Sequence, residues 1–111
     1  MKYSFKKTDD WIVIEVEGKN ETLTSFSNGG WTSDKIQLII DGVENTKTNG
    51  LRYEWANEDI HLVAIEDGVY FYDLLARRAD KNHPKGQDLD LSHNVFIGFL
   101  NDFKKFIEEN S

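Results

Sequence analysis

The three histidines, and the serine next to one of them, are the first residues to consider for catalysis. His61, His83 and His93 are not spaced as metal ligands on one helix or strand face, and no His-Glu-x-x-His motif occurs. Ser92 and His93 are adjacent, but consecutive residues at a helix start point in different directions, and no Gly-x-Ser-x-Gly elbow is present. We interpret Ser92 as a helix cap, His93 as a surface residue and His61 as a partly buried strand residue.

Carboxylates and phosphate-binding loops are the next candidates for chemistry. The pair Asp88-x-Asp90 lacks the full ligand set of a calcium loop, and its neighbours Leu89 and Leu91 alternate as a short extended segment would. Neither Gly-x-Gly-x-x-Gly nor Gly-x-x-x-x-Gly-Lys occurs, and the chain has no cysteine. We therefore predict a protein that is not an enzyme and that uses no metal and no cofactor.

The chain is acidic, and its charge is unevenly distributed. Its 111 residues include 20 acids and 13 bases, which gives a net charge of −7. The segment 77–85 carries +3, so the remainder carries −10. Its bases are Arg77, Arg78, Lys81 and Lys85. An acidic body repels nucleic acid and anionic membranes and attracts a basic partner, although acidity also serves solubility alone. We expect a protein partner, and no nucleic-acid or membrane partner.

Aromatic residues alternate along two predicted strands, as Tyr53 with Trp55 and as Tyr70 with Tyr72. We expect one of these faces to meet the C-terminal helix and the other to be partly exposed. In protein recognition, exposed rings supply contact area and neighbouring carboxylates supply electrostatic steering. Such rings equally fill the second side of a small core. The predicted partner-binding residues are Tyr53, Glu54, Trp55, Glu58, Asp59, Glu66 and Asp67.

Alternating apolar residues predict an N-terminal β-hairpin. Residues 2–6 and 11–17 alternate in polarity on either side of a polar turn, and residues 18–20 form the next turn. Residues 21–32 fit either a short edge strand or a loop, with Asn28-Gly29-Gly30 as a turn.

The segment after Ser33 fits two structures. Four residues share one helical face, namely Ile36, Ile39, Ile40 and Val43, whereas Ile36, Leu38 and Ile40 also alternate as in a strand. We favour a helix over residues 34–45, capped by Ser33 or Asp34 and followed by a polar break at 46–50.

Three β-like runs and a final helix complete the chain. Residues 51–56, 60–65 and 69–75 are joined by tight connections and predict an antiparallel meander. Residues 76–91 have no apolar period and predict an exposed loop. Ser92 precedes a helix with an apolar face formed by Val95, Phe96, Phe99, Leu100, Phe103, Phe106 and Ile107.

The predicted fold class is α+β, in a single domain spanning residues 1–111. An antiparallel β-sheet, made of the N-terminal hairpin and the three-stranded meander, is packed by the C-terminal α-helix and one shorter helix. The first residues lack the apolar run of a signal peptide, and no stretch reaches the length of a membrane span. We therefore expect a cytoplasmic protein.

In its overall composition and predicted fold, the chain resembles the immunity proteins of bacterial contact-dependent growth inhibition and polymorphic-toxin systems. The shared features are a short, cysteine-free acidic chain, antiparallel strands and a closing apolar helix, and no sequence motif is among them. The resemblance implies a toxin partner, such as a nuclease domain whose basic cleft is blocked by carboxylates that imitate phosphates. On this hypothesis, the carboxylates among the predicted binding residues supply charge, and Tyr53 and Trp55 are anchors.

Two other functions fit the sequence. The first is a small-ligand-binding or enzymatic α+β domain with a pocket between sheet and helix, near His61 and Asp73. A deep pocket with converging polar groups would favour this function over protein binding. The second is a regulatory subunit whose basic segment 77–85 docks onto an acidic neighbour.

Overall fold

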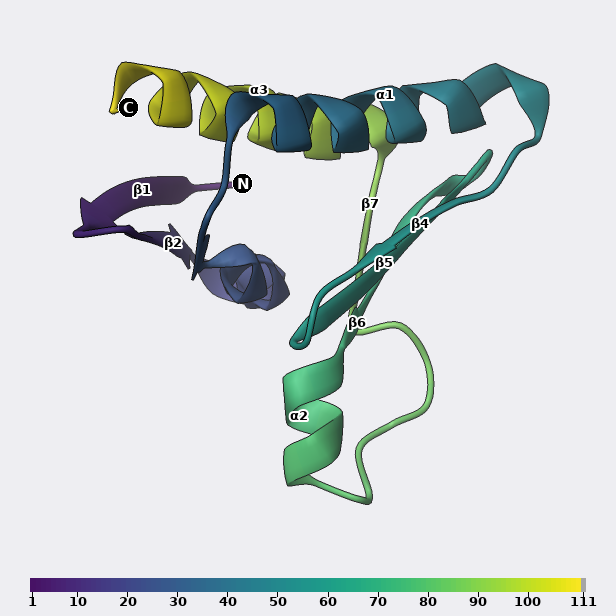
Figure 1. The fold of residues 1–111 in the computed structure, drawn as a ribbon. Helices are drawn as coiled ribbons and strands as arrows, with labels where there is room; N and C mark the ends of the chain where they lie inside the picture. Colours follow the sequence, from purple (N-terminus) through teal and green to yellow (C-terminus); the bar gives the residue numbers. More distant parts are fainter. Residues whose placement is uncertain (111) are drawn as a thin grey trace.

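Two long helices lie across one side of two small antiparallel sheets (Figure 1). The computed structural model describes residues 1–110, without the side chain of Lys19. The predicted α+β class is confirmed, but the hairpin and the meander belong to separate sheets rather than to one. A short 3-10 helix, η1, fills the space between the sheets beneath the helices (Figure 1).

The first sheet is the predicted hairpin with one added edge strand. β1 (Tyr3–Thr8) pairs with β2 (Trp11–Val16), and β3 (Asn28–Gly29) pairs with the start of β2. Phe5, on the inward side of β1, stacks on a phenylalanine of the last helix, Phe103, with ring centroids 5.4 Å apart. Beside it, burial and a hydrogen bond to Asp102 raise the pKa of Tyr3 to about 12.

The predictions for residues 18–32 are partly wrong. η1 (Gly18–Phe26) replaces the predicted turn and much of the predicted loop, and only Asn28–Gly29 forms the edge strand. Leu23 and Phe26 are three residues apart and completely buried, which is the spacing of one 3-10 turn. Burial of two apolar side chains therefore gives this polar segment its structure.

The helix favoured after residue 33 is confirmed as α1 (Ser33–Asn49). Leu38 is 67% exposed whereas Ile39 is 1% exposed, a contrast that fits the helical face and not the alternating strand. Thr32, rather than Ser33 or Asp34, caps the helix by accepting a hydrogen bond from Lys35 N.

The polar break predicted at 46–50 is wrong, because α1 continues through most of it. Thr46 is 1% exposed and donates its hydroxyl to the Val43 carbonyl within the helix, which satisfies the buried polar group. The helix ends at Gly50, which adopts the left-handed conformation with φ +68°.

The predicted meander is confirmed within the second sheet. Its strands are β4 (Tyr53–Ala56), β5 (Ile60–Ile65) and β6 (Gly68–Asp73), and β7 (Leu89–Leu91) pairs with β6 as a fourth strand. The strand order is β4-β5-β6-β7.

The exposed loop predicted at 76–91 is wrong at both ends. The chain leaves β6 in a short helix, α2 (Leu74–Ala79), which takes two residues from the predicted third strand, and it returns in β7. Asp73 caps α2 by accepting a hydrogen bond from Ala76 N over 2.9 Å. The sequence 74–79 consists of strong helix formers, so a cap is sufficient to start a short helix here.

The last helix, α3 (His93–Glu109), is confirmed with its Ser92 cap. Four members of its predicted apolar face are completely buried, namely Phe96, Phe99, Leu100 and Phe103. Val95 is 45% exposed and does not belong to that face. His93 is not a surface residue as predicted, because its Nε2 donates to the Ile65 carbonyl over 2.7 Å between the second sheet and α1.

Candidate functional site

The side of the second sheet that faces away from the core is a surface of aromatic and acidic side chains. Phe71 and Leu62 are completely buried on the core side, and their strand neighbours therefore point to the other side. We call this surface the outer sheet face; its residues are Glu54, His61, Val63, Tyr70, Tyr72 and Asp90. Both tyrosines are half-buried, and both carboxylates are exposed.

The strand register places the two carboxylates at the ends of a row that contains a valine and a tyrosine. Glu54 lies opposite Val63, Val63 opposite Tyr70, and Tyr70 opposite Asp90. Val63 is only 7% exposed, so the side chains around it cover most of its surface. The result is a row across all four strands with an apolar and aromatic centre and an acid at each end.

A histidine and an arginine hold one of these acids ionised. Arg52 and His61 lie 3.3 and 2.9 Å from opposite oxygens of the Glu54 carboxylate. The hydrogen bond from Arg52 has the largest effect on the pKa of Glu54, which it lowers. The hydrogen bond from His61 lowers this pKa further. The His61 ring also packs against Tyr72 at a centroid distance of 5.8 Å, so it links the acid to the aromatic residues.

Asp88 is the centre of a second cluster, at the end of the sheet beside α2. Its carboxylate accepts hydrogen bonds from the Asp73 backbone N over 2.6 Å, from His83 Nε2 over 2.5 Å and from Arg77 over 3.3 Å. Arg77 also donates to the Gly86 carbonyl over 2.6 Å. One carboxylate thus connects β6, α2 and the loop that follows α2.

The environment of Asp88 favours its ionised form. Burial, the largest single influence, raises the pKa of Asp88, but the hydrogen bonds from Asp73 and His83 and the charge of Arg77 together lower it below the ordinary 3.8. The Asp88 side chain is only 15% exposed, so solvent screens its interactions with these partners only weakly. We interpret the Asp88 cluster as the brace that fixes α2 and residues 80–88.

Replacing Asp88 with asparagine is expected to lower the free energy of unfolding by about 1–3 kcal/mol at neutral pH. Because the pKa of Asp88 is lower in the folded protein, its contribution is present above pH 3.8 and is lost as the pH falls through the folded value. Urea unfolding of wild type and D88N from about pH 2 to 7 checks this. A difference between the two proteins that stays constant to the acid end would contradict the assignment.

Part of the predicted basic segment 77–85 is engaged in contacts within the protein. Arg78 lies 3.2 Å from the Asp59 carboxylate and donates a hydrogen bond to the Glu58 carbonyl, while Lys81 and Lys85 are exposed. The structure therefore brings part of the basic segment together with the predicted acidic turn at 58–59. This pairing offsets part of the negative charge at that turn, as Arg52 does at Glu54.

The predicted anchors lie on the core side of β4. Trp55 stacks on Phe26 and Trp31 with centroid distances of 5.3 and 5.6 Å, and burial raises the pKa of Tyr53. Both rings remain half-buried. The predicted site residues therefore divide between the two sides of β4 instead of sharing one surface.

The two predicted acidic turns lie at opposite ends of the meander. Residues 58–59 precede β5, and residues 66–67 follow it, so the sheet separates them by the length of that strand. Tyr70, Tyr72 and Asp90 are absent from the predicted site residues. The alternation of the tyrosines with Val69 and Phe71 was the signal that pointed to them.

Residues 1–110 contain neither a metal-binding cluster nor a membrane-spanning helix. Within these residues, no three or more histidine and acidic side chains are grouped so that they could hold a metal ion. No helix in the same part of the chain combines the length and the apolar character needed to cross a membrane.

Comparison with known proteins identifies no relative of this chain. No protein-family model, no curated protein and no solved structure matches it.

Proposed function

We propose that this protein binds a basic protein partner through the outer sheet face, and that it acts as an immunity protein that neutralises a toxin domain. The observation that carries the proposal is the row in which Glu54 and Asp90 flank Val63 and Tyr70. Tyrosine supplies large contact area at low conformational cost, and carboxylates around it supply orientation and exclude acidic partners.

The charge of the whole chain supports the same partner. A net charge of −7 produces a long-range field that accelerates encounter with a basic domain. The body of the protein therefore attracts the partner, and the outer sheet face gives the complex its fixed orientation. A nuclease domain is the class of toxin that fits best, because its substrate-binding cleft must be basic.

The proposal is tested with the protein domain encoded directly upstream of this chain in its source genome. Co-expression of the chain with that domain is expected to restore growth of a bacterial host that the domain alone arrests. Between about 50 and 500 mM salt, the association rate constant is expected to fall at least tenfold, with little change in the dissociation rate. Surface plasmon resonance measures both rates.

The same experiment can contradict the proposal in two ways. Purified proteins that fail to associate at low salt would refute binding to this partner. Association with a rate constant that does not depend on salt would refute the electrostatic basis of recognition, because steering by an acidic surface is screened by added ions.

A further inference from the structure

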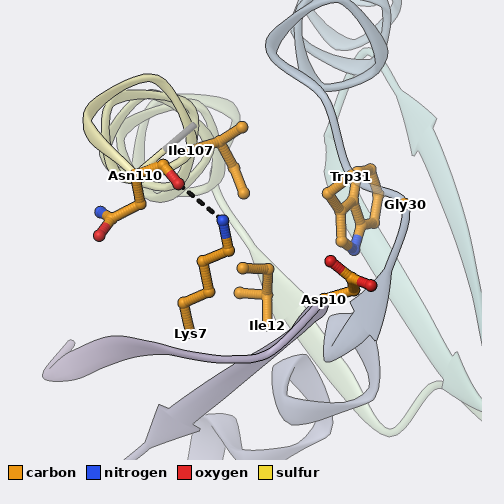
Figure 2. Close-up of a pocket in the computed structure, with 7 residues that line it drawn as sticks. All are labelled: Lys7, Asp10, Ile12, Gly30, Trp31, Ile107 and Asn110. Carbon is orange, nitrogen blue, oxygen red and sulfur yellow. Dashed lines mark hydrogen bonds between the residues drawn. The ribbon is translucent and has the colours of Figure 1, made fainter.

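A hollow of about 290 Å³ opens where three distant segments of the chain meet (Figure 2). The end of the hairpin forms one side, the connection between β3 and α1 the second, and the last turn of α3 the third. Its lining includes Lys7, Asp10, Ile12, Trp31, Ile107 and Asn110, and neither His61 nor Asp73. The hollow is thus distinct from both the outer sheet face and the pocket predicted between sheet and helix.

The inner surface of the hollow is apolar and held in place by the core. Ile12 is 5% exposed, and Ile107 and Trp31 are half-buried. The indole Nε1 of Trp31 donates to the Phe26 carbonyl over 2.8 Å, so the polar atom of this ring is already satisfied. The ring therefore offers apolar surface to the hollow.

Lys7 occupies an inward position of β1 that an apolar residue would be expected to fill. Tyr3 and Phe5, at the two preceding inward positions, pack against the core, and Lys7 follows them directly opposite Ile12. Its Nζ donates to the Asn110 carbonyl over 2.7 Å at the end of α3. An ammonium group has three N–H donors, so this bond leaves two for a ligand.

Asp10 supplies the opposite charge on the other side of the hollow. Figure 2 shows its carboxylate and the Lys7 amine on either side of the Ile12 side chain. Among the described residues, the Asp10 carboxylate has no hydrogen-bond or ion-pair partner. The hollow therefore has an apolar centre with a cation at one side and an unpaired anion at the other.

We propose that this hollow binds a small aromatic zwitterion that carries a carboxylate at one end of its ring and a cationic nitrogen at the other. The carboxylate binds Lys7, the nitrogen binds Asp10, and the ring covers Ile12 beside Trp31. A cavity of roughly 150 Å³ admits benzene, so a hollow of about twice that volume accommodates a ring with a substituent at each end. This ligand site is independent of the protein-binding function proposed above.

The test uses the full chain and three matched compounds at low salt. 4-(Aminomethyl)benzoate carries both charges, benzoate lacks the amine and benzylamine lacks the carboxylate. Titrations followed by ¹H–¹⁵N NMR are expected to show the tightest binding for 4-(aminomethyl)benzoate, with the largest shifts at Lys7, Ile107 and the Trp31 indole. Removal of either charge from the compound is expected to weaken binding by about threefold, since each charge forms one ion pair with an exposed side chain.

Three variants assign the two charges to their residues. K7M keeps the apolar part of the side chain and is expected to bind 4-(aminomethyl)benzoate no better than benzylamine, while D10N binds it no better than benzoate. K6M is the matched control, because Lys6 is the neighbouring residue on the other side of β1 and pairs with Glu15 at 3.3 Å. Equal losses in K6M and K7M, or shifts in wild type that miss the hollow, would overturn the proposal.

Discussion

Replacing Phe26 with alanine is expected to lower the free energy of unfolding by about 3–5 kcal/mol. Phe26 is the last residue of η1 and is completely buried. Its ring centroid lies between 5.3 and 6.4 Å from those of five other aromatic residues, namely Trp31, Trp55, Phe71, Phe96 and Phe99. The alanine variant would leave a cavity where η1, the second sheet and α3 meet.

Guanidinium chloride unfolding of F26A, compared with L38A, measures this effect. Leu38 lies on α1 and is 67% exposed, so its truncation is expected to change the free energy of unfolding by about 0.5 kcal/mol or less. Domains of this size are stabilised by about 5–15 kcal/mol in total, which makes the expected loss in F26A a large fraction. Similar stabilities for the two variants would show that Phe26 does not organise the core.

Reversing the charges of Glu54 and Asp90 together, in the variant E54K/D90K, is expected to weaken partner binding at least about tenfold. The two acids lie at the ends of the row across the second sheet, outside Val63 and Tyr70, and lysines at these places would repel a basic partner. The loss is expected mainly in the association rate, because both side chains are exposed at the rim of the surface. Surface plasmon resonance with the upstream-encoded domain separates the two rates.

A second double variant, E17K/E109K, controls for net charge. Each double variant changes the net charge from −7 to −3, and Glu17 and Glu109 are exposed at sites outside the second sheet. The control is expected to weaken binding by less than about threefold, since it alters only the screened long-range field. Equal losses in both double variants would mean that total charge, and not the outer sheet face, determines binding.

Long periodic segments were predictable from the sequence because their own side chains determine which face is buried. The hairpin, α1, the meander and α3 all follow from apolar spacing. η1 and α2 were missed because their structure depends on residues elsewhere in the fold. Phe26 needs the rings of the second sheet and α3, and the start of α2 needs Asp88 to hold the Asp73 backbone.

The candidate site was predictable in part for the same reason. The alternating tyrosines and tryptophan of β4 and β6 indicated two faces, one packed and one exposed. Only the fold decides between them, because Phe26 and Trp31 stack on Trp55 and so direct the β4 rings toward the core. The ion pair between Arg78 and Asp59 could not be predicted from the sequence either, since the two residues are 19 positions apart.

Oxidative footprinting of the complex tests the central claim most directly, because it reports the exposure of individual side chains. On addition of the upstream-encoded domain, labelling of Tyr70, Tyr72 and His61 is expected to fall. Trp11, which is 51% exposed on the first sheet, serves as the internal reference and is expected to keep its labelling. Unchanged labelling of both tyrosines in a formed complex, with protection of Trp11 instead, would contradict binding through the outer sheet face.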